Sequence, residues 1–94
     1  MRMTFRVGQV EQHEVAFSFD KMWGGRKIEV DGVSVMDDVL LLSLSLTKVW
    51  EFPVGTAEVH QVRIEHHRPL LFSFARRQPI KAFVDGQLVA EDAA

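Results

Sequence analysis

Four histidines, His13, His60, His66 and His67, are the residues of this chain best suited to metal or acid–base chemistry. Neutral imidazole is a common metal ligand, and neighbouring strands can bring two or three such side chains together. The spacing is unfavourable, because the chain contains no His-x-His pair and no His-Glu-x-x-His run. We therefore expect ordinary surface histidines and no cofactor. A metal-binding protein or metal-dependent enzyme that uses these histidines is the alternative.

Other catalytic patterns are weaker still. The absence of cysteine excludes disulfides, thiolate zinc sites and cysteine nucleophiles. No serine lies in a Gly-x-Ser-x-Gly turn, and the Gly24-Gly25 stretch lacks the lysine and serine that end a phosphate-binding loop. The acid pairs Asp37-Asp38 and Glu91-Asp92 adjoin predicted strand ends without an acid–base partner, so we expect them to face water. The sequence favours a protein that is not an enzyme.

A basic segment with interleaved aromatic residues is the candidate binding surface. It comprises Arg63, His66, His67, Arg68, Phe72, Phe74, Arg76 and Arg77. Cations and stacking rings are the ingredients of a nucleic-acid surface. However, the whole chain has a formal net charge of −2 and a pI near 6.0, which disfavours a general nucleic-acid binder. We expect a protein partner with an acidic patch, and no cofactor.

Two Asp-Gly hairpins bracket the fold that carries these residues. In residues 24–35, Ile28 and Val30 alternate with polar neighbours before Asp31-Gly32, a pair that tolerates the positive φ angles of a two-residue type I′ turn. Residues 80–89 repeat the pattern around Asp85-Gly86. Both segments share the motif Val-Asp-Gly-x-x-Val. The sequence therefore predicts one hairpin near the middle of the chain and one near its end.

Period-two alternation predicts further strands. They cover residues 3–7, 13–20, 39–46, 50–54 and 58–65. A turn is expected near Thr47-Lys48, so that residues 39–54 form a hairpin, and Pro53 favours an edge strand because it cannot donate a ladder hydrogen bond. Asp37-Asp38 and residues 66–69 are expected to end strands. Residues 70–79 fit a strand, a helical turn or a lid over the core.

These elements predict a single domain over residues 1–94. Its class is all-β, an antiparallel β-sandwich or small barrel of about seven to eight strands built from β-hairpins. The longest apolar run, residues 39–42, is too short to cross a bilayer. The N-terminal stretch alternates polar and apolar residues instead of forming a signal-peptide core, so we expect a soluble cytoplasmic protein.

Four segments carry a resemblance to a known family. They are Val-Ala-Phe-Ser-Phe-Asp (15–20), Gly-Arg-Lys-Ile-Glu-Val-Asp-Gly (25–32), Phe-Pro-Val-Gly (52–55) and Val-Asp-Gly-Gln-Leu (84–88). In order and spacing they resemble the β-sandwich of the Fas apoptotic inhibitory molecule family. The resemblance implies an all-β, soluble, non-enzymatic protein. Residues 66–78 depart from it, being longer and more basic than the corresponding family loop, and no role in cell death is carried over.

Apolar residues outside the regular strands raise the question of assembly. Leu70, Leu71, Phe72 and Phe74 add apolar surface, and Val39 and Leu41 are expected to point away from the core. Either residues 70–74 fold over Val39 and Leu41 as a lid, or two chains cover this surface as a symmetric dimer. We favour the lid and a monomer over a homodimer, because Arg76-Arg77 would repel their copies across a two-fold axis.

Overall fold

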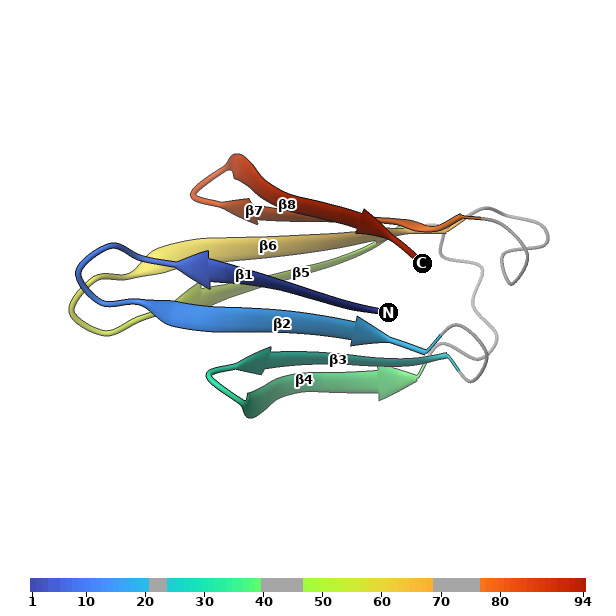
Figure 1. Ribbon diagram of the computed structural model, residues 1–94, viewed down its shortest axis with the longest axis horizontal. Helices are drawn as coiled ribbons and strands as arrows, with labels where there is room; N and C mark the ends of the chain where they lie inside the picture. Colours follow the sequence, from blue (N-terminus) through green and yellow to red (C-terminus); the bar gives the residue numbers. More distant parts are fainter. Residues whose placement is uncertain (21–23, 40–46, 69–76) are drawn as a thin grey trace.

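The computed structural model describes residues 1–20, 24–39, 47–68 and 77–94, and every regular element in these ranges is a β-strand (Figure 1). The strands are β1 (Arg2–Val7), β2 (His13–Phe19), β3 (Gly25–Val30), β4 (Val33–Val39), β5 (Thr47–Val54), β6 (His60–His67), β7 (Pro79–Val84) and β8 (Gln87–Ala93). No helix in the described part of the chain is long and apolar enough to cross a membrane.

The strands form two antiparallel sheets of four, in the orders β1-β2-β3-β4 and β5-β6-β7-β8. Each sheet is a simple meander, in which every strand pairs with the next in the chain. The turns β1–β2, β3–β4, β5–β6 and β7–β8 all lie at one end of the molecule, which we call the hairpin end (Figure 1). The predicted antiparallel β-sandwich is confirmed, and the sheets do not close into a barrel.

The core lies between the two sheets and follows from the alternation of apolar residues. It comprises Met3, Phe5, Val7, Val15, Phe17, Phe19, Ile28, Trp50, Val54, Val62, Ile64, Ile80 and Ala82. Phe17 of the first sheet meets Trp50 of the second, with ring centroids 5.5 Å apart and planes tilted by 49°. The predicted inward positions Val15, Phe17, Val62 and Ile64 are confirmed. Burial of these large apolar side chains is the main source of stability.

The two sheets are built from related sequences. Residues 5–15 read Phe-x-Val-Gly-x-x-Glu-x-His-x-Val, and residues 52–62 repeat the same pattern. The ladder irregularities also correspond, since the β3–β4 register shifts at Ile28/Glu29 and the β7–β8 register shifts at Ala82/Phe83, two residues before the end of each strand. The chain is thus a tandem pair of four-stranded units. The two predicted Asp-Gly hairpins are only the most visible part of this duplication.

Both Asp-Gly turns have the predicted conformation. The φ angles are 52° and 81° at Asp31 and Gly32, and 49° and 83° at Asp85 and Gly86. Positive φ at both central residues is the requirement of a type I′ turn, whose twist matches that of the strands on either side. The two hairpin predictions are confirmed.

Three boundary predictions are wrong. Thr47 and Lys48 do not form a turn, because their backbones pair with His67 and His66 and so extend β5. For the same reason β6 continues through His67 instead of ending before His66. Asp37-Asp38 does not end a strand either, because β4 continues opposite Lys27 and Arg26 of β3. In each case ladder pairing with a neighbouring strand outweighs the local composition of the segment.

Two other predictions have different outcomes. Pro53 lies in β5, which is the edge strand of its sheet, so the predicted edge position is confirmed. Of the expected strand over residues 39–46, Val39 is the last residue of β4, and residues 40–46 lie outside the described residues, as does the expected lid over residues 70–74. The choice between a lid and a dimer interface therefore stays a prediction.

Candidate functional site

His13 lies between two carboxylates at the hairpin end. Its Nε2 is 2.6 Å from a carboxylate oxygen of Glu11, and its Nδ1 is 2.5 Å from Oδ2 of Asp31. The other oxygen of Asp31 accepts the backbone N–H of Glu14 at 2.8 Å. The type I′ turn places Asp31 beside the start of β2, where His13 begins the strand. The imidazole thus joins the β1–β2 loop to the β3–β4 turn.

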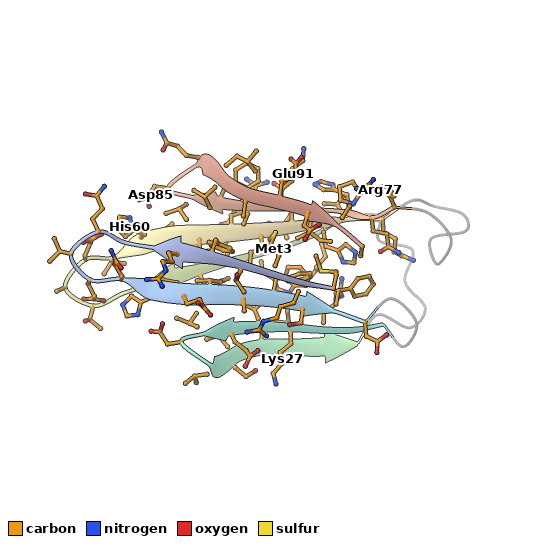
Figure 2. The ribbon with its side chains drawn as sticks, viewed as in Figure 1. Met3, Lys27, His60, Arg77, Asp85 and Glu91 are labelled. Carbon is orange, nitrogen blue, oxygen red and sulfur yellow. The ribbon has the colours of Figure 1, made fainter. Side chains whose placement is uncertain are left out.

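His60 repeats this arrangement in the second unit. Its ring nitrogens are each 2.5 Å from a carboxylate oxygen, Nε2 from Glu58 and Nδ1 from Asp85. Oδ1 of Asp85 accepts the backbone N–H of Gln61 at 2.9 Å. Figure 2 shows His60 and Asp85 side by side at the hairpin end. The duplication therefore preserves the site as well as the strands.

Glu11 and Glu58 each accept hydrogen bonds from a loop of the opposite unit. Glu11 accepts the backbone N–H groups of Thr56 and Ala57, at 2.7 and 2.8 Å, in the β5–β6 loop. Glu58 accepts those of Gln9 and Val10, at 2.8 and 2.9 Å, in the β1–β2 loop. Each unit thus supplies the carboxylate that holds a loop of the other unit. We call Glu11, His13, Asp31, Glu58, His60 and Asp85 the loop clasp.

Electrostatics within the loop clasp favour charged forms. The pKa of His13 is raised above its ordinary value of 6.5 by the bond to Asp31 and then by the bond to Glu11, and the pKa of His60 is raised by Asp85 and then by Glu58. The pKa of Glu11 and that of Glu58 are lowered to about 2, first by the histidine and then by backbone N–H donors. Hydrogen bonds to a charged form stabilise that form. Each cluster therefore favours the imidazolium form of its histidine, which lies between two carboxylates.

This protonation state bears on the metal alternative. An imidazolium has no lone pair, so it cannot ligate a metal ion. Among the residues that the structure describes, no group of three or more histidine and acidic side chains is arranged to hold a metal. In the arrangement seen, the loop clasp holds loops in place and offers no open position for a ligand.

His66 was predicted to lie on the surface, and this is wrong. The residue is 2% exposed, because β6 continues its alternation from Val62 and Ile64 and so turns His66 into the core. Its Nε2 is 2.8 Å from Oε1 of Gln78, and its ring centroid is 4.6 Å from that of Phe19. Burial is the main reason that the pKa of His66 is lowered. His66 therefore presents almost no surface to a partner.

Arg26 lies beside His66 and is a buried residue that the sequence reasoning missed. Its Nη1 is 3.4 Å from Nδ1 of His66, and its guanidinium lies 4.9 Å from the centre of the Trp50 ring. A signal was available, because Arg26 has the same parity in β3 as the inward Ile28. The positive charge of Arg26 favoured a surface position instead. Arg26 and His66 come from different units, so this polar contact joins the two sheets inside the core.

Among the residues that the structure describes, the other members of the predicted binding surface do not form one patch. Arg63 lies in the middle of β6 and points outward, whereas Arg77 is exposed just before β7, at the end opposite the hairpin end (Figure 2). His67 bonds Glu65 at 3.1 Å. Arg68 is half-buried. Phe72, Phe74 and Arg76 lie outside the described residues.

Arg63 belongs to a row of outward side chains that crosses the second sheet. The register places Glu51, Arg63, Phe83 and Leu88 opposite one another on successive strands. The Arg63 guanidinium lies 5.9 Å from the centre of the Phe83 ring, and Leu88 is exposed. A surface hollow of about 280 Å³ is lined by Glu51, Gln61, Val62, Arg63, Phe83 and Gly86. We call this row and its hollow the Arg63–Phe83 face.

The corresponding row of the first sheet is different. By the duplication, Thr4, Ala16, Glu29 and Ser34 take the equivalent positions, and none of them is aromatic or basic. Ala16 is 3% exposed, and an ion pair between Arg2 of β1 and Glu29 of β3, at 3.4 Å, reaches across β2. Each unit thus contributes three equivalent residues to the loop clasp. The Arg63–Phe83 face, in contrast, has no counterpart in the row of the first sheet.

Comparison of this chain with models of known protein families and with curated proteins finds no match. The duplication allows a different comparison, between the two four-stranded units of the chain. We treat a feature present in both units as structural, and a feature confined to one unit as a candidate for function. By this criterion the Arg63–Phe83 face is the candidate functional site, and the loop clasp is a structural element.

Proposed function

We propose that this protein is a non-enzymatic interaction module that binds a protein partner through the Arg63–Phe83 face. The observation that carries the proposal is the outward row itself, in which an arginine lies over an aromatic ring beside an exposed leucine and a surface hollow. Arginine and aromatic residues are enriched at binding hot spots, where they combine large contact area with directional polar groups.

The engagement of the histidines supports this function over the alternative of a metal-dependent enzyme. Both ring nitrogens of His13 and of His60 are bonded to carboxylates. His66 is buried between Gln78 and Arg26. A metal would have to displace these internal bonds before it could bind. The protein-binding reading requires no such rearrangement.

The charges around Arg63 indicate which partner the face would accept. Glu65 holds the guanidinium at 2.6 Å, whereas Glu51 lies at 3.9 Å and its side chain is 63% exposed. Exposed pairs of that length contribute little stability, so an incoming carboxylate can take the place of Glu51. Phe83 and Leu88 offer apolar contact beside it. The face therefore suits a protein that presents an acidic side chain next to an apolar one, and the two glutamates disfavour a nucleic-acid phosphate backbone.

The resemblance to the Fas apoptotic inhibitory molecule family stays a prediction, because no family model matches the chain. It agrees with the proposal in one respect, since it also implies a soluble, non-enzymatic β-sandwich. The cytoplasmic location is likewise an expectation from the sequence. Neither is needed for the binding argument, which rests on the geometry of the second sheet.

The experiment is affinity capture from native lysate with the parent protein and three variants. Arg63→Glu reverses the charge at the centre of the face, Phe83→Ala removes its ring, and Lys27→Glu is the matched control on the outer face of the first sheet (Figure 2). We expect the parent and Lys27→Glu to retain the same protein, and the other two variants to lose it. Melting curves establish that all versions are folded.

Two results would contradict the proposal. Equal capture by all versions would place the binding surface elsewhere. Stoichiometric metal in protein purified without a histidine tag, together with a large loss of thermal stability on chelation, would favour the metal-dependent alternative. For the proposed function we expect no bound metal and no shift with chelator.

A further inference from the structure

The contacts of the loop clasp require a particular number of protons. A neutral imidazole has one N–H donor and one lone pair, whereas an imidazolium has two donors. In both clusters each ring nitrogen faces a carboxylate oxygen at 2.5 or 2.6 Å. A lone pair at that distance from a carboxylate oxygen is repelled. Both contacts of His13, and both contacts of His60, are therefore favourable only in the imidazolium form.

Loss of one ring proton from a histidine of one unit affects a loop of the opposite unit. When His13 is neutral, one of its carboxylates loses its donor and faces a lone pair instead. Glu11 also accepts the N–H groups of Thr56 and Ala57, so a displaced Glu11 releases the β5–β6 loop. In the same way, a neutral His60 that loses its contact with Glu58 releases the β1–β2 loop at Gln9. The duplication makes the two routes equivalent.

We infer that the loop clasp is a proton-dependent lock, which joins the two units at the hairpin end while His13 and His60 are protonated and opens when they lose their protons. None of the six residues of the loop clasp belongs to the Arg63–Phe83 face, although Gln61, which lines the hollow of that face, donates its backbone N–H to Asp85. The lock does not require a bound partner. The ligand that controls it is the proton.

The charged groups around each histidine agree with this reading. Those that face His13 are Glu11 from the β1–β2 loop and Asp31 from the β3–β4 turn. Those that face His60 are Glu58 from the β5–β6 loop and Asp85 from the β7–β8 turn. All four are carboxylates. Arg6, a cation on the neighbouring strand β1, donates instead to Gln12 at 3.4 Å.

The direction of the pH effect follows from these neighbours. The pKa of each histidine is raised in the folded protein, so the stabilisation is complete below 6.5 and is lost as the pH rises through the raised value. The pKa of Glu11 and of Glu58 is lowered to about 2, so their contribution is present above 4.5 and is lost as the pH falls towards 2. The lock is therefore closed in mildly acidic solution and opens as the pH rises through the raised pKa of the histidines.

NMR titration of the whole chain tests the inference. The ring signals of His13 and His60 should titrate above the ordinary histidine value. The amide signals of Thr56 and Ala57 should move with the ring of His13, and those of Gln9 and Val10 with the ring of His60. In His13→Gln, the Thr56 and Ala57 amides should take their high-pH positions throughout, while the Gln9 and Val10 amides continue to titrate.

The matched control is His67→Gln, because His67 bonds Glu65 outside the loop clasp and its removal should leave every clasp titration unchanged. The parent protein alone can overturn the inference, so the result does not depend on whether a variant folds. Ring titration at or below 6.5 would show that the carboxylates do not hold the imidazolium. Ring titration without movement of the opposing loop amides would show that the protons do not control the loops.

Discussion

Three glycine-to-alanine substitutions separate two physical effects at the turns. Gly8 has a φ of +96°, and an added Cβ would lie 1.9 Å from the backbone oxygen of Glu11. Gly32 has a φ of +81°, but an added Cβ there would have no atom within 4 Å. At Gly25 the Cβ would also meet nothing within 4 Å, and φ is not positive. Gly25→Ala therefore introduces neither effect, Gly32→Ala introduces backbone strain, and Gly8→Ala introduces backbone strain together with a clash.

The expected magnitudes follow in that order. Gly25→Ala should change the free energy of unfolding by no more than about 0.5 kcal/mol, as is usual for surface substitutions. Gly32→Ala should cost about 1 to 2 kcal/mol, which is the penalty of left-handed backbone for a residue with a Cβ. Gly8→Ala should cost at least about 3 kcal/mol, because a contact of 1.9 Å forces the β1–β2 loop to move. That movement also displaces Glu11 from the loop clasp.

Urea and thermal unfolding measure the series. One kcal/mol corresponds to a shift in Tm of roughly 4 to 8 °C for a domain of this size, so the three variants are well resolved. Equal melting temperatures for Gly8→Ala and Gly32→Ala would refute the close approach of the two backbone segments at Gly8. Equal melting of Gly32→Ala and Gly25→Ala would refute the type I′ turn.

Three further predictions concern the core, the pH dependence and assembly. Phe17 is fully buried against Trp50, so Phe17→Ala should lower the free energy of unfolding by about 3 to 5 kcal/mol in urea, and a loss below 1 kcal/mol would contradict its central position. The parent Tm should fall as the pH rises through the raised pKa of His13 and His60, and this fall should be absent from His13→Gln/His60→Gln; the same fall in both proteins would exclude the histidines as its cause. Light scattering should give a concentration-independent mass near 10.7 kDa, whereas a stable mass of twice that value, lost in Leu71→Asp, would indicate a homodimer.

The parts of the fold that depend on neighbouring residues were predictable. Alternation identified β2 and β6, and the Asp-Gly pairs identified both hairpin turns, because these signals reflect the conformation of a few consecutive residues. The ends of the strands were harder to predict. Thr47-Lys48 resembled a turn by composition, but the ladder with β6 extends the strand through it. Such pairing depends on a strand that lies elsewhere in the chain.

The candidate sites required contacts between distant segments. Glu11 and the backbone of Glu58 are 47 positions apart in the chain, so only the packing of the two units reveals the loop clasp. One signal was present in the sequence, since the run Gly-x-x-Glu-x-His occurs at residues 8–13 and again at 55–60. The burial of His66 followed from strand parity, but its position in a basic segment favoured the surface. The Arg63–Phe83 face depends on register between β6 and β7, which the sequence does not specify.

We propose that a partner binds the Arg63–Phe83 face, and chemical-shift mapping with the captured partner tests this most directly. On titration of the labelled protein with that partner, we expect the largest shifts at Glu51, Arg63, Phe83 and Leu88. Lys27 and Glu29 on the outer face of the first sheet should remain unperturbed. Shifts concentrated on the first sheet or at the loop clasp, with residues 51, 63, 83 and 88 unchanged, would contradict the proposed site.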